Sequence, residues 1–468
     1  MRHLLLAVLL VALPRAGRAQ APRITPAGDP SVRNDTIYRL AVDPADHPDD
    51  DFIYLLDDGV IRFEADGRGT RTYRQVIQIL TQDGAEGWGE QSFSYSSGSE
   101  RLTVNWIRVL TTTGEVISAQ PAHEQESLAP VAFDAPVYSD QKVRRMTLSG
   151  VAPGTLVDWS YTIERTKPLV PGDYYTGWRV TTGLLTRRSR LIVDVPASVT
   201  PRIQEENVRF RRRVAEARGR RVYTWATAEV EKIETEPFAA VPNTLYVGID
   251  VAAPITWSAI ATWYAGLTAG RYVLTPELEA ELAAQVRDAR TFDDSLRAVH
   301  RWVAQDFRYV SLSLGIGGYL PRLPAEVLAT RYGDCKDKAT LFIAMARRMG
   351  VPAYPVLLSS SGTADSSLPT VQQFDHMIAA VDRPAAGGTV DRLYLDLTSE
   401  FTPYGELPPA EQGSFALVVH DDGAVEQVRL PEAPVSANLA ATRIVGELDR
   451  DGHFTGRFTE SKRGSLQY

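Results

Sequence analysis

The sequence is nearly without cysteine, since Cys335 is the single one among 468 residues. An intramolecular disulfide is therefore excluded, and a lone thiol in an exported protein would be open to oxidation. Two interpretations of Cys335 stay open at this point: a reactive nucleophile, or a small hydrophobic residue packed in a core. The residues around it must decide between them.

The chain also lacks a hydrophobic run long enough to cross a bilayer, which takes about 20 residues. The apolar stretch 4–13 is only ten residues long, follows Arg2, and is followed by small residues at Gly17 and Ala19. This is the layout of a secretory signal peptide cleaved after Ala19, with an uncleaved anchor as the alternative. We expect residues 1–19 to be removed and the protein to be exported, to the periplasm or outside the cell.

An excess of positive charge is missing as well. The net charge is −8, which argues against a nucleic-acid partner. The strongly basic stretch 209–221 contains seven arginines. Glu216 interrupts it and Gly219 supplies a turn, so we interpret it as a solvated hairpin, with an anion-binding patch as the alternative.

The first half of the chain has the pattern of a β-rich domain. Residues 20–50 are rich in proline and aspartate and are expected to form a linker or tail. Within 51–240, the stretch 156–164 alternates apolar and polar residues with the period of a half-buried strand. Turn residues separate many short stretches of this kind. We predict an antiparallel, β-sandwich-like domain over residues 51–240.

The second half mixes helical and strand patterns. Residues 241–425 are predicted to form an α+β core, because apolar residues recur at helical spacing in stretches such as 293–304. Residues 426–468 return to strands around a turn at 449–452. Because so few residues rarely fold alone, we expect them to pack on another part of the protein or to belong to a further domain.

Cys335 is predicted to lie at the start of a helix. Apolar residues follow it at helical spacing up to Met349, and Gly350 then ends the pattern. Asp334 suits the N-cap position. A helix N-terminus stabilises a thiolate, and its free backbone N–H groups can hold an oxyanion. The position therefore favours a nucleophile, although Cys335 also borders the apolar stripe of the helix.

A nucleophilic cysteine needs a base, and the base needs a group that orients it. His376 opens a strand-like run, 376–381, and a second run, 392–397, follows after a loop. If the two pair as a hairpin centred on Ala386, opposed residues have numbers that sum to 772, and His376 faces Asp396. Asp375 is the rival carboxylate, but its side chain should point to the other face.

These motifs resemble the transglutaminase-like superfamily. The resembling segments are Trp302-Val303, Arg308-Tyr309-Val310, Gly315–Tyr319, Arg331–Lys338, Phe374-Asp375-His376 and Leu395-Asp396-Leu397-Thr398. The likeness is closest to bacterial exported proteins that join a papain-like α+β core to an N-terminal β-rich domain of unknown function. It covers about residues 50–425. Such relatives often have Asn before the histidine and Pro after the aspartate, from which Asp375 and Leu397 depart.

The resemblance implies a Cys335–His376–Asp396 triad that transfers acyl groups through a thioester, without a cofactor or a metal. The substrate would be a protein or peptide. Trp302, Tyr319 and Asp334 are predicted to line the cleft, with a core role as the alternative for Trp302. Two other functions stay open: a non-catalytic exported scaffold or binding module, and an acetyl-transferring enzyme with the same triad.

Overall fold

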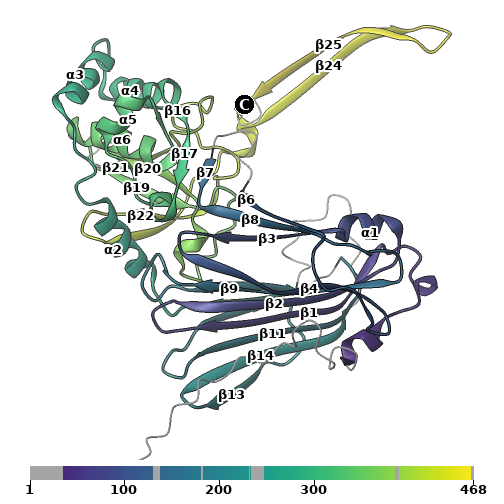
Figure 1. Cartoon of the computed structure of the whole chain (residues 1–468). Helices are drawn as coiled ribbons and strands as arrows, with labels where there is room; N and C mark the ends of the chain where they lie inside the picture. The colour runs from purple at the N-terminus through teal and green to yellow at the C-terminus, as the bar shows by residue number, and fades with distance from the viewer. Residues whose placement is uncertain are drawn as a thin grey trace, which may run out of the picture.

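The computed structural model describes residues 35–129, 137–180, 183–230, 232, 247–384 and 389–464. The predicted signal peptide, and residues 20–34 of the predicted linker, lie outside this part of the chain. Figure 1 shows a β-rich body, an α/β body beside it, and a long hairpin that extends away from both. The multidomain fold class predicted from the sequence is therefore confirmed.

The β-rich domain is built on one large twisted sheet. Its strands lie in the order β13 (Arg213–Ala217), β14 (Arg220–Val230), β11 (Thr186–Pro196), β1 (Phe52–Phe63), β2 (Gly69–Ile79), β9 (Thr155–Arg165), β4 (Glu100–Thr111) and β5 (Val116–Ser118). Neighbours are antiparallel except β1 and β11, which run parallel. The predicted basic hairpin is the pair β13–β14, with Gly219 in its turn at φ 73°.

Two small sheets cover one face of the large sheet. They consist of β10 (Tyr175–Val180), β15 (Val247–Ala252) and β12 (Arg202–Glu206), and of β3 (Glu90–Ser96), β8 (Gln141–Thr147) and β6 (His123–Leu128). Large apolar side chains fill the space between the layers, among them Trp178, Trp225 and Trp159. The opposite face packs near one end on Tyr38 of a short helix, η2 (Thr36–Leu40). A further short helix, α1 (Gln82–Trp88), joins β2 to β3.

The α/β core consists of helices packed on an antiparallel sheet. Its strands lie in the order β21 (Val390–Leu395), β20 (His376–Pro384), β19 (Ala353–Leu358), β22 (Phe415–Val419) and β23 (Val425–Arg429). The helices are α2 (Trp257–Thr268), α3 (Pro276–Gln285), α4 (Phe292–Asp306), α5 (Pro324–Thr330) and α6 (Cys335–Arg348). The inner face of α6 is buried in a large apolar cluster with residues of β19, β20 and β22. This helix is the centre of the core.

Two strand pairings join parts of the chain that the predicted boundary at residue 240 would separate. Strand β15 belongs to a sheet of the β-rich domain, although it lies beyond that boundary. Strand β7 (Val137–Ser139) of the β-rich domain runs parallel to β17 (Ser311–Ser313) of the core. A second short pair, β16 (Arg308–Tyr309) with β18 (Tyr332–Gly333), leads into α6.

The last described strands form the extended hairpin of Figure 1. Strands β24 (Leu439–Leu448) and β25 (Phe454–Arg463) pair along their whole length, around the predicted turn at 449–452. Every residue of both strands is exposed. Neither strand therefore buries a face against the rest of the described residues, and their assignment to a further domain stays a prediction.

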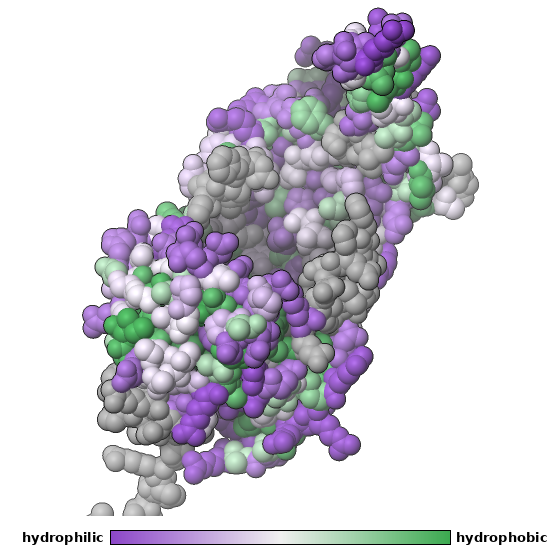
Figure 2. Space-filling model, turned by 90° about the vertical axis from the view of Figure 1, so that its right-hand side faces the viewer, coloured by the Kyte–Doolittle hydropathy of each residue, from purple (hydrophilic) through white to green (hydrophobic). Residues whose placement is uncertain are grey.

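The surface is mixed in character. Figure 2 shows hydrophilic residues over most of one face, with hydrophobic residues in small groups between them. None of the helices in the described residues is long and apolar enough to cross a membrane.

Candidate active site

Cys335 is the first residue of α6, as predicted. The Asp334 side chain accepts a hydrogen bond from the backbone N–H of Asp337 at 3.3 Å. In return, the Asp337 carboxylate accepts from the backbone N–H of Asp334 at 3.4 Å, which completes a capping box. Cys335 is half-buried. The positive end of the helix dipole therefore lies at the thiol.

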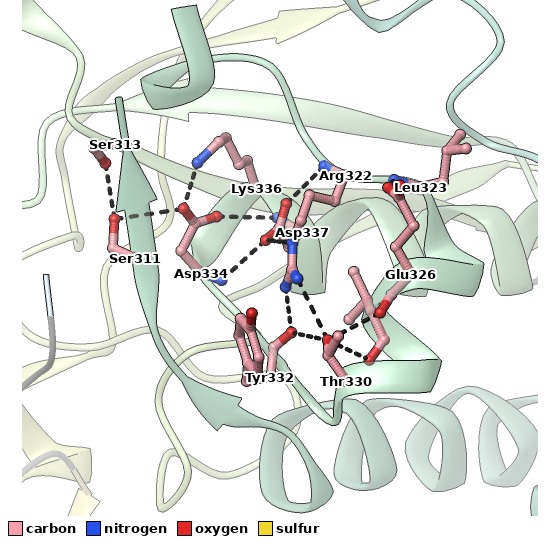
Figure 3. Close-up of polar contacts among 11 residues, drawn as sticks. Ser311, Ser313, Arg322, Leu323, Glu326, Thr330, Tyr332, Asp334, Lys336 and Asp337 are labelled. Atoms are coloured by element: carbon pink, nitrogen blue, oxygen red, sulfur yellow. Dashed lines mark hydrogen bonds and ion pairs between the residues drawn. The ribbon is translucent and has the colours of Figure 1, made fainter. Parts of the chain in front are cut away.

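An arginine from the preceding loop fixes this helix start. Arg322 donates to the Asp337 carboxylate from its backbone N–H at 2.8 Å and from Nε at 2.9 Å. It also donates to the backbone carbonyl of Tyr332 (Figure 3). Gly333 is needed in the same place, because a Cβ there would lie 2.7 Å from the Cβ of Asp337. The turn before Cys335 is thus held by packing and by charge.

The two lysines that follow Cys335 also have structural partners. Lys336 forms an ion pair with Asp334, to which Ser311 also donates at 3.5 Å (Figure 3). Burial is the main cause that raises the pKa of Asp334, against the effect of Lys336. The Lys338 ammonium is buried and donates to two backbone carbonyls at the end of α4, those of Ala304 and Phe307, both at 3.0 Å. The motif around Cys335 therefore joins α6 to its neighbours.

His376 meets Cys335 across the core. It is the first residue of β20, opposite Leu358 of β19. Its Nε2 lies 3.4 Å from Oδ1 of Asp396. Burial by itself would lower the pKa of His376, but hydrogen bonds with Asp396, Cys335 and Glu411 raise it well above its usual value. These hydrogen bonds therefore favour the imidazolium form of His376.

The hairpin that joins His376 to Asp396 differs from the prediction in its register. Ala379 pairs with Leu395 and Pro384 with Val390, so opposed residues have numbers that sum to 774, not 772. Strand β20 continues further than expected and β21 ends at Leu395. Because a shift by two residues preserves the face, His376 and Asp396 still share one, as diagonal rather than direct neighbours. The predicted register was wrong, and the predicted proximity is nevertheless observed.

Asp396 is held in place directly after the end of β21. Only 4% of its surface is exposed, and its carboxylate accepts hydrogen bonds from the backbone N–H and the hydroxyl of Thr398, both at 2.8 Å. Burial would raise its pKa, but the hydrogen bond and the charge of His376 lower it below the usual value. The rival Asp375 accepts from the backbone N–H and the hydroxyl of Ser360.

A second carboxylate at His376 was not predicted. Oε1 of Glu411 lies 3.3 Å from the same Nε2 that faces Asp396, and Glu411 is 4% exposed. Burial is the main cause that raises its pKa to about 7, with a further contribution from the charge of Asp396. Glu411 lies in a loop between β21 and β22, where no periodic pattern or motif marked it.

Tyr309 is the second residue that the sequence reasoning did not assign to the site. It pairs with Gly333 in the short parallel sheet that precedes Cys335. Burial raises the pKa of Tyr309 above its usual value, and the charges of Cys335 and Asp334 contribute. Its position inside one of the resembling segments was the available signal, but nothing in that segment indicated that Tyr309 is near Cys335.

Of the three predicted cleft residues, Tyr319 lies in the cleft. It lines a narrow pocket of about 30 Å³ together with Cys335, His376, Tyr264 and Phe374. The prediction for Trp302 is corrected, because this side chain is 5% exposed and packs edge-on against Phe307 in the core. Asp334 is buried in the capping box and does not line the pocket.

One part of the site could also hold a metal ion. His376, Asp396 and Glu411 each offer a ligand atom within 4.8 Å of the others. A second group of three, Asp449, Asp451 and His453, is exposed at the hairpin tip. Hydrogen bonds with His376 already explain why the three residues of the first group lie close together. The expectation of a metal-free site stays a prediction.

A thiol at a helix N-terminus, an imidazole on a facing strand and a carboxylate beyond it define the class of papain-like cysteine enzymes. Comparisons agree with this class. Residues 280–381 match the transglutaminase-like superfamily, and residues 65–234 match a domain of unknown function, DUF3857. The chain therefore joins a region that matches the transglutaminase-like superfamily to a region that matches DUF3857.

A solved structure supports the fold. A protein from Parabacteroides distasonis, provisionally described as a protease, is similar with a TM-score of 0.63 and 16% identity, over 82% of this chain and 72% of that one. A provisional cysteine protease from Cytophaga hutchinsonii matches 70% of this chain and 75% of its own with 12% identity, but its TM-score of 0.22 carries no argument. A search of curated proteins finds no match.

Proposed function

We propose that this protein is a thiol-dependent acyl-transfer enzyme, which cleaves or transfers amide bonds of a protein or peptide through a thioester on Cys335. The observation that carries the proposal is the contact of His376 with both Cys335 and Asp396 at the start of α6. The superfamily and the fold support a cysteine-type enzyme, and the reaction itself is our inference.

The proposed reaction has two stages. The Cys335 thiolate attacks the carbonyl carbon, and backbone N–H groups at the start of α6 stabilise the negative charge on the oxygen. The imidazolium of His376 gives its proton to the leaving amine as the C–N bond breaks. His376 then takes a proton from water or from an acceptor amine, which attacks the thioester and releases Cys335. Asp396 keeps the imidazole ring oriented throughout.

The first experiment uses the fact that Cys335 is the single cysteine, so that alkylation is specific to one site. We expect iodoacetamide at pH 6 to label the folded protein at least about tenfold faster than the same protein unfolded in urea, because the site stabilises the thiolate. The His376→Ala variant should lose this advantage. Equal rates for folded and unfolded protein would overturn the proposed nucleophile.

The second experiment looks for the thioester. The protein and its Cys335→Ala variant are incubated with a mixture of peptides, and intact-mass spectrometry follows adducts on the protein. We expect a hydroxylamine-sensitive acyl adduct on the wild type alone, unchanged when a metal chelator is present. A reactive thiol that never acquires an adduct, whatever the peptide, would favour the non-catalytic binding module.

Export is the further part of the proposal. It is supported by the signal-peptide pattern in residues 1–19. Comparison of the mature N-terminus of the expressed protein with the sequence tests it. Cleavage after Ala19 is expected, and a protein that retains residues 1–19 in the cytoplasm would contradict it.

A further inference from the structure

A large pocket lies between the two domains, directly beside the catalytic pocket. Its volume is about 480 Å³, against about 30 Å³ for the pocket at Cys335. The two pockets share Gly318 and Tyr319 as lining residues. A chain bound at the thiol therefore has room to continue past Tyr319, and on that side it meets the β-rich domain.

The β-rich domain lines this pocket with three cationic side chains, which are Arg71, Arg165 and Lys167. The carboxylate of Glu100 lies 2.5 Å from Arg71 and 3.8 Å from Nε of Arg165, so two guanidinium groups share it. Lys167 is exposed and has no ion-pair partner among the described residues. Burial and the nearby charge of Arg71 lower the pKa of Arg165.

The two other acidic residues that line the pocket, Asp173 and Asp140, accept hydrogen bonds from nearby groups. Asp173 is 2% exposed and accepts hydrogen bonds from the hydroxyl of Thr370 at 3.0 Å and the backbone N–H of Val371 at 3.3 Å. Burial raises its pKa to about 6, against the effects of these hydrogen bonds and of the charge of Arg165. Asp140 accepts from the backbone N–H of Gly98 at 3.0 Å. The pocket is thus lined by three cationic and three acidic side chains, and among the cations Lys167 has no ion-pair partner within the described residues.

We propose that the interdomain pocket is a subsite that binds a carboxylate of the peptide substrate through Arg165 and Lys167. The proposal rests on the proposed function, because it extends a peptide from Cys335 past Tyr319. Arginine and lysine suit this ligand, since charge-assisted hydrogen bonds to carboxylates are the strong ones. The carboxylate comes either from an acidic side chain or from the C-terminus of the peptide, and the chemistry of recognition is the same.

The position of Arg165 supports this role in a second way. Its guanidinium donates to the side chain of Gln372 at 3.1 Å, and Gln372 lies on the core segment that leads to His376. A carboxylate bound at Arg165 would therefore touch both domains at once. The β-rich domain would then select the substrate, while the core carries the chemistry.

The experiment measures binding without turnover, using the Cys335→Ala protein. Four N-acetylated alanine pentapeptides serve as probes, with Glu or Gln at the fourth position and a free acid or an amide at the C-terminus. We expect at least one carboxylate to raise the affinity in calorimetry about tenfold over the Gln amide, as a charge-assisted contact allows. Comparison of the Glu amide with the Gln acid identifies the source of the carboxylate.

Variants assign the effect to the pocket. Lys167→Gln changes an exposed residue, and Arg165→Lys keeps the charge but loses the planar donor group. We expect Lys167→Gln and Arg165→Gln to remove most of the preference, and Arg165→Lys to keep part of it. Arg101→Gln is the matched control, because Arg101 is a 71% exposed arginine of the same sheet that does not line the pocket.

Equal affinities for the four peptides, including no binding of any, would overturn the proposed subsite. A preference that survives in both glutamine variants would do the same. The proposed function is judged separately by alkylation of Cys335. A carboxylate preference in a protein with an ordinary thiol would keep the subsite and reject the chemistry.

Discussion

His376 faces two carboxylates through one ring nitrogen. Nε2 lies 3.4 Å from Asp396 and 3.3 Å from Glu411, and both acids are nearly inaccessible to solvent. The two carboxyl groups ionise in different pH ranges, because the pKa of Asp396 is lowered and that of Glu411 is raised to about 7. Near neutral pH, Asp396 is ionised while Glu411 gains and loses its proton. We therefore expect Glu411 to affect the imidazole in a pH-dependent way.

The Glu411→Gln variant tests this effect. Loss of an anion near the imidazolium should lower the pKa of His376, so the alkaline transition in the pH profile of Cys335 alkylation should move to lower pH. A shift of about one pH unit is expected, since one unit corresponds to about 1.4 kcal/mol, the size of a charge-assisted hydrogen bond. The profile is measured with iodoacetamide from pH 5 to pH 10.

The matched control is Glu432→Gln, which changes an exposed glutamate of the same part of the chain. Its profile should be that of the wild type. If Glu411→Gln lowers the alkylation rate by the same factor at every pH and leaves the pH of the alkaline transition unchanged, Glu411 only supports the local fold.

The proximity of Cys335, His376 and Asp396 could be predicted from the sequence because each of these residues has a local signal. Cys335 precedes a helical pattern, His376 opens a strand, and Asp396 lies where a hairpin brings it back. Glu411 has no such signal, and Tyr309 has only its place in a segment that resembles the superfamily. A residue that reaches a site from an irregular loop, or from a strand of two residues, is placed by the tertiary fold alone.

The start of α6 is the element on which the site depends. Gly333, the capping box and Arg322 set the direction in which the Cys335 thiol and the first free N–H groups point. The N-cap was predictable from Asp334 and the helical spacing. The role of Arg322 was not, because it comes from a separate loop and recognises Asp337 only in the folded protein.

The Gly333→Ala variant should disturb this helix start. An added Cβ would lie 2.7 Å from the Cβ of Asp337, so the capping box must open or the helix must shift. We expect a loss of stability of about 1–3 kcal/mol, as for other overpacked positions, and slower alkylation of Cys335. Denaturant unfolding and the labelling rate measure the two effects.

Gly266→Ala provides the comparison within another helix, α2. Nothing lies within 4 Å of a Cβ at that position, and Gly266 is exposed. Alanine should stabilise it, by up to about 1 kcal/mol, because it favours the helix more than glycine does. Wild-type stability and labelling in Gly333→Ala would show that the close approach to Asp337 is not required.

The hairpin register shows the limit of prediction at the level of the element. Apolar alternation determines which face of the sheet a residue occupies. The prediction that His376 and Asp396 share a face was correct. Alternation has a period of two, so it cannot separate a register from one shifted by two residues. The predicted register, in which paired residue numbers sum to 772, and the observed one, in which they sum to 774, differ in how far β20 extends beyond Val381. The apolar alternation of the sequence does not determine that length.

The two domains are joined by contacts that no local pattern contains. Strand β7 pairs with β17, and β15 returns to the β-rich domain from beyond the predicted boundary. Asp173 of the β-rich domain accepts two hydrogen bonds from the core segment at Thr370 and Val371. Strand pairing between distant segments is set by the packed whole, so composition could separate the domains but could not show how they meet.

The contact at Asp173 should make the whole molecule less stable as the pH rises. Its pKa is raised from an unfolded value near 3.8 to about 6, mainly by burial. Between these values the folded protein binds more protons than the unfolded chain, so stability falls from about pH 4 to pH 6 and stays lower above.

The Asp173→Asn variant keeps a carbonyl acceptor for Thr370 and carries no charge. It should therefore be more stable than the wild type at pH 7.5, by an amount on the order of 1–3 kcal/mol, and similar to it at pH 4. Thermal unfolding at both pH values measures this, with the exposed Asp288→Asn as control. A variant less stable than the wild type at pH 7.5 would show that the Asp173 charge, through Arg165, holds the two domains together.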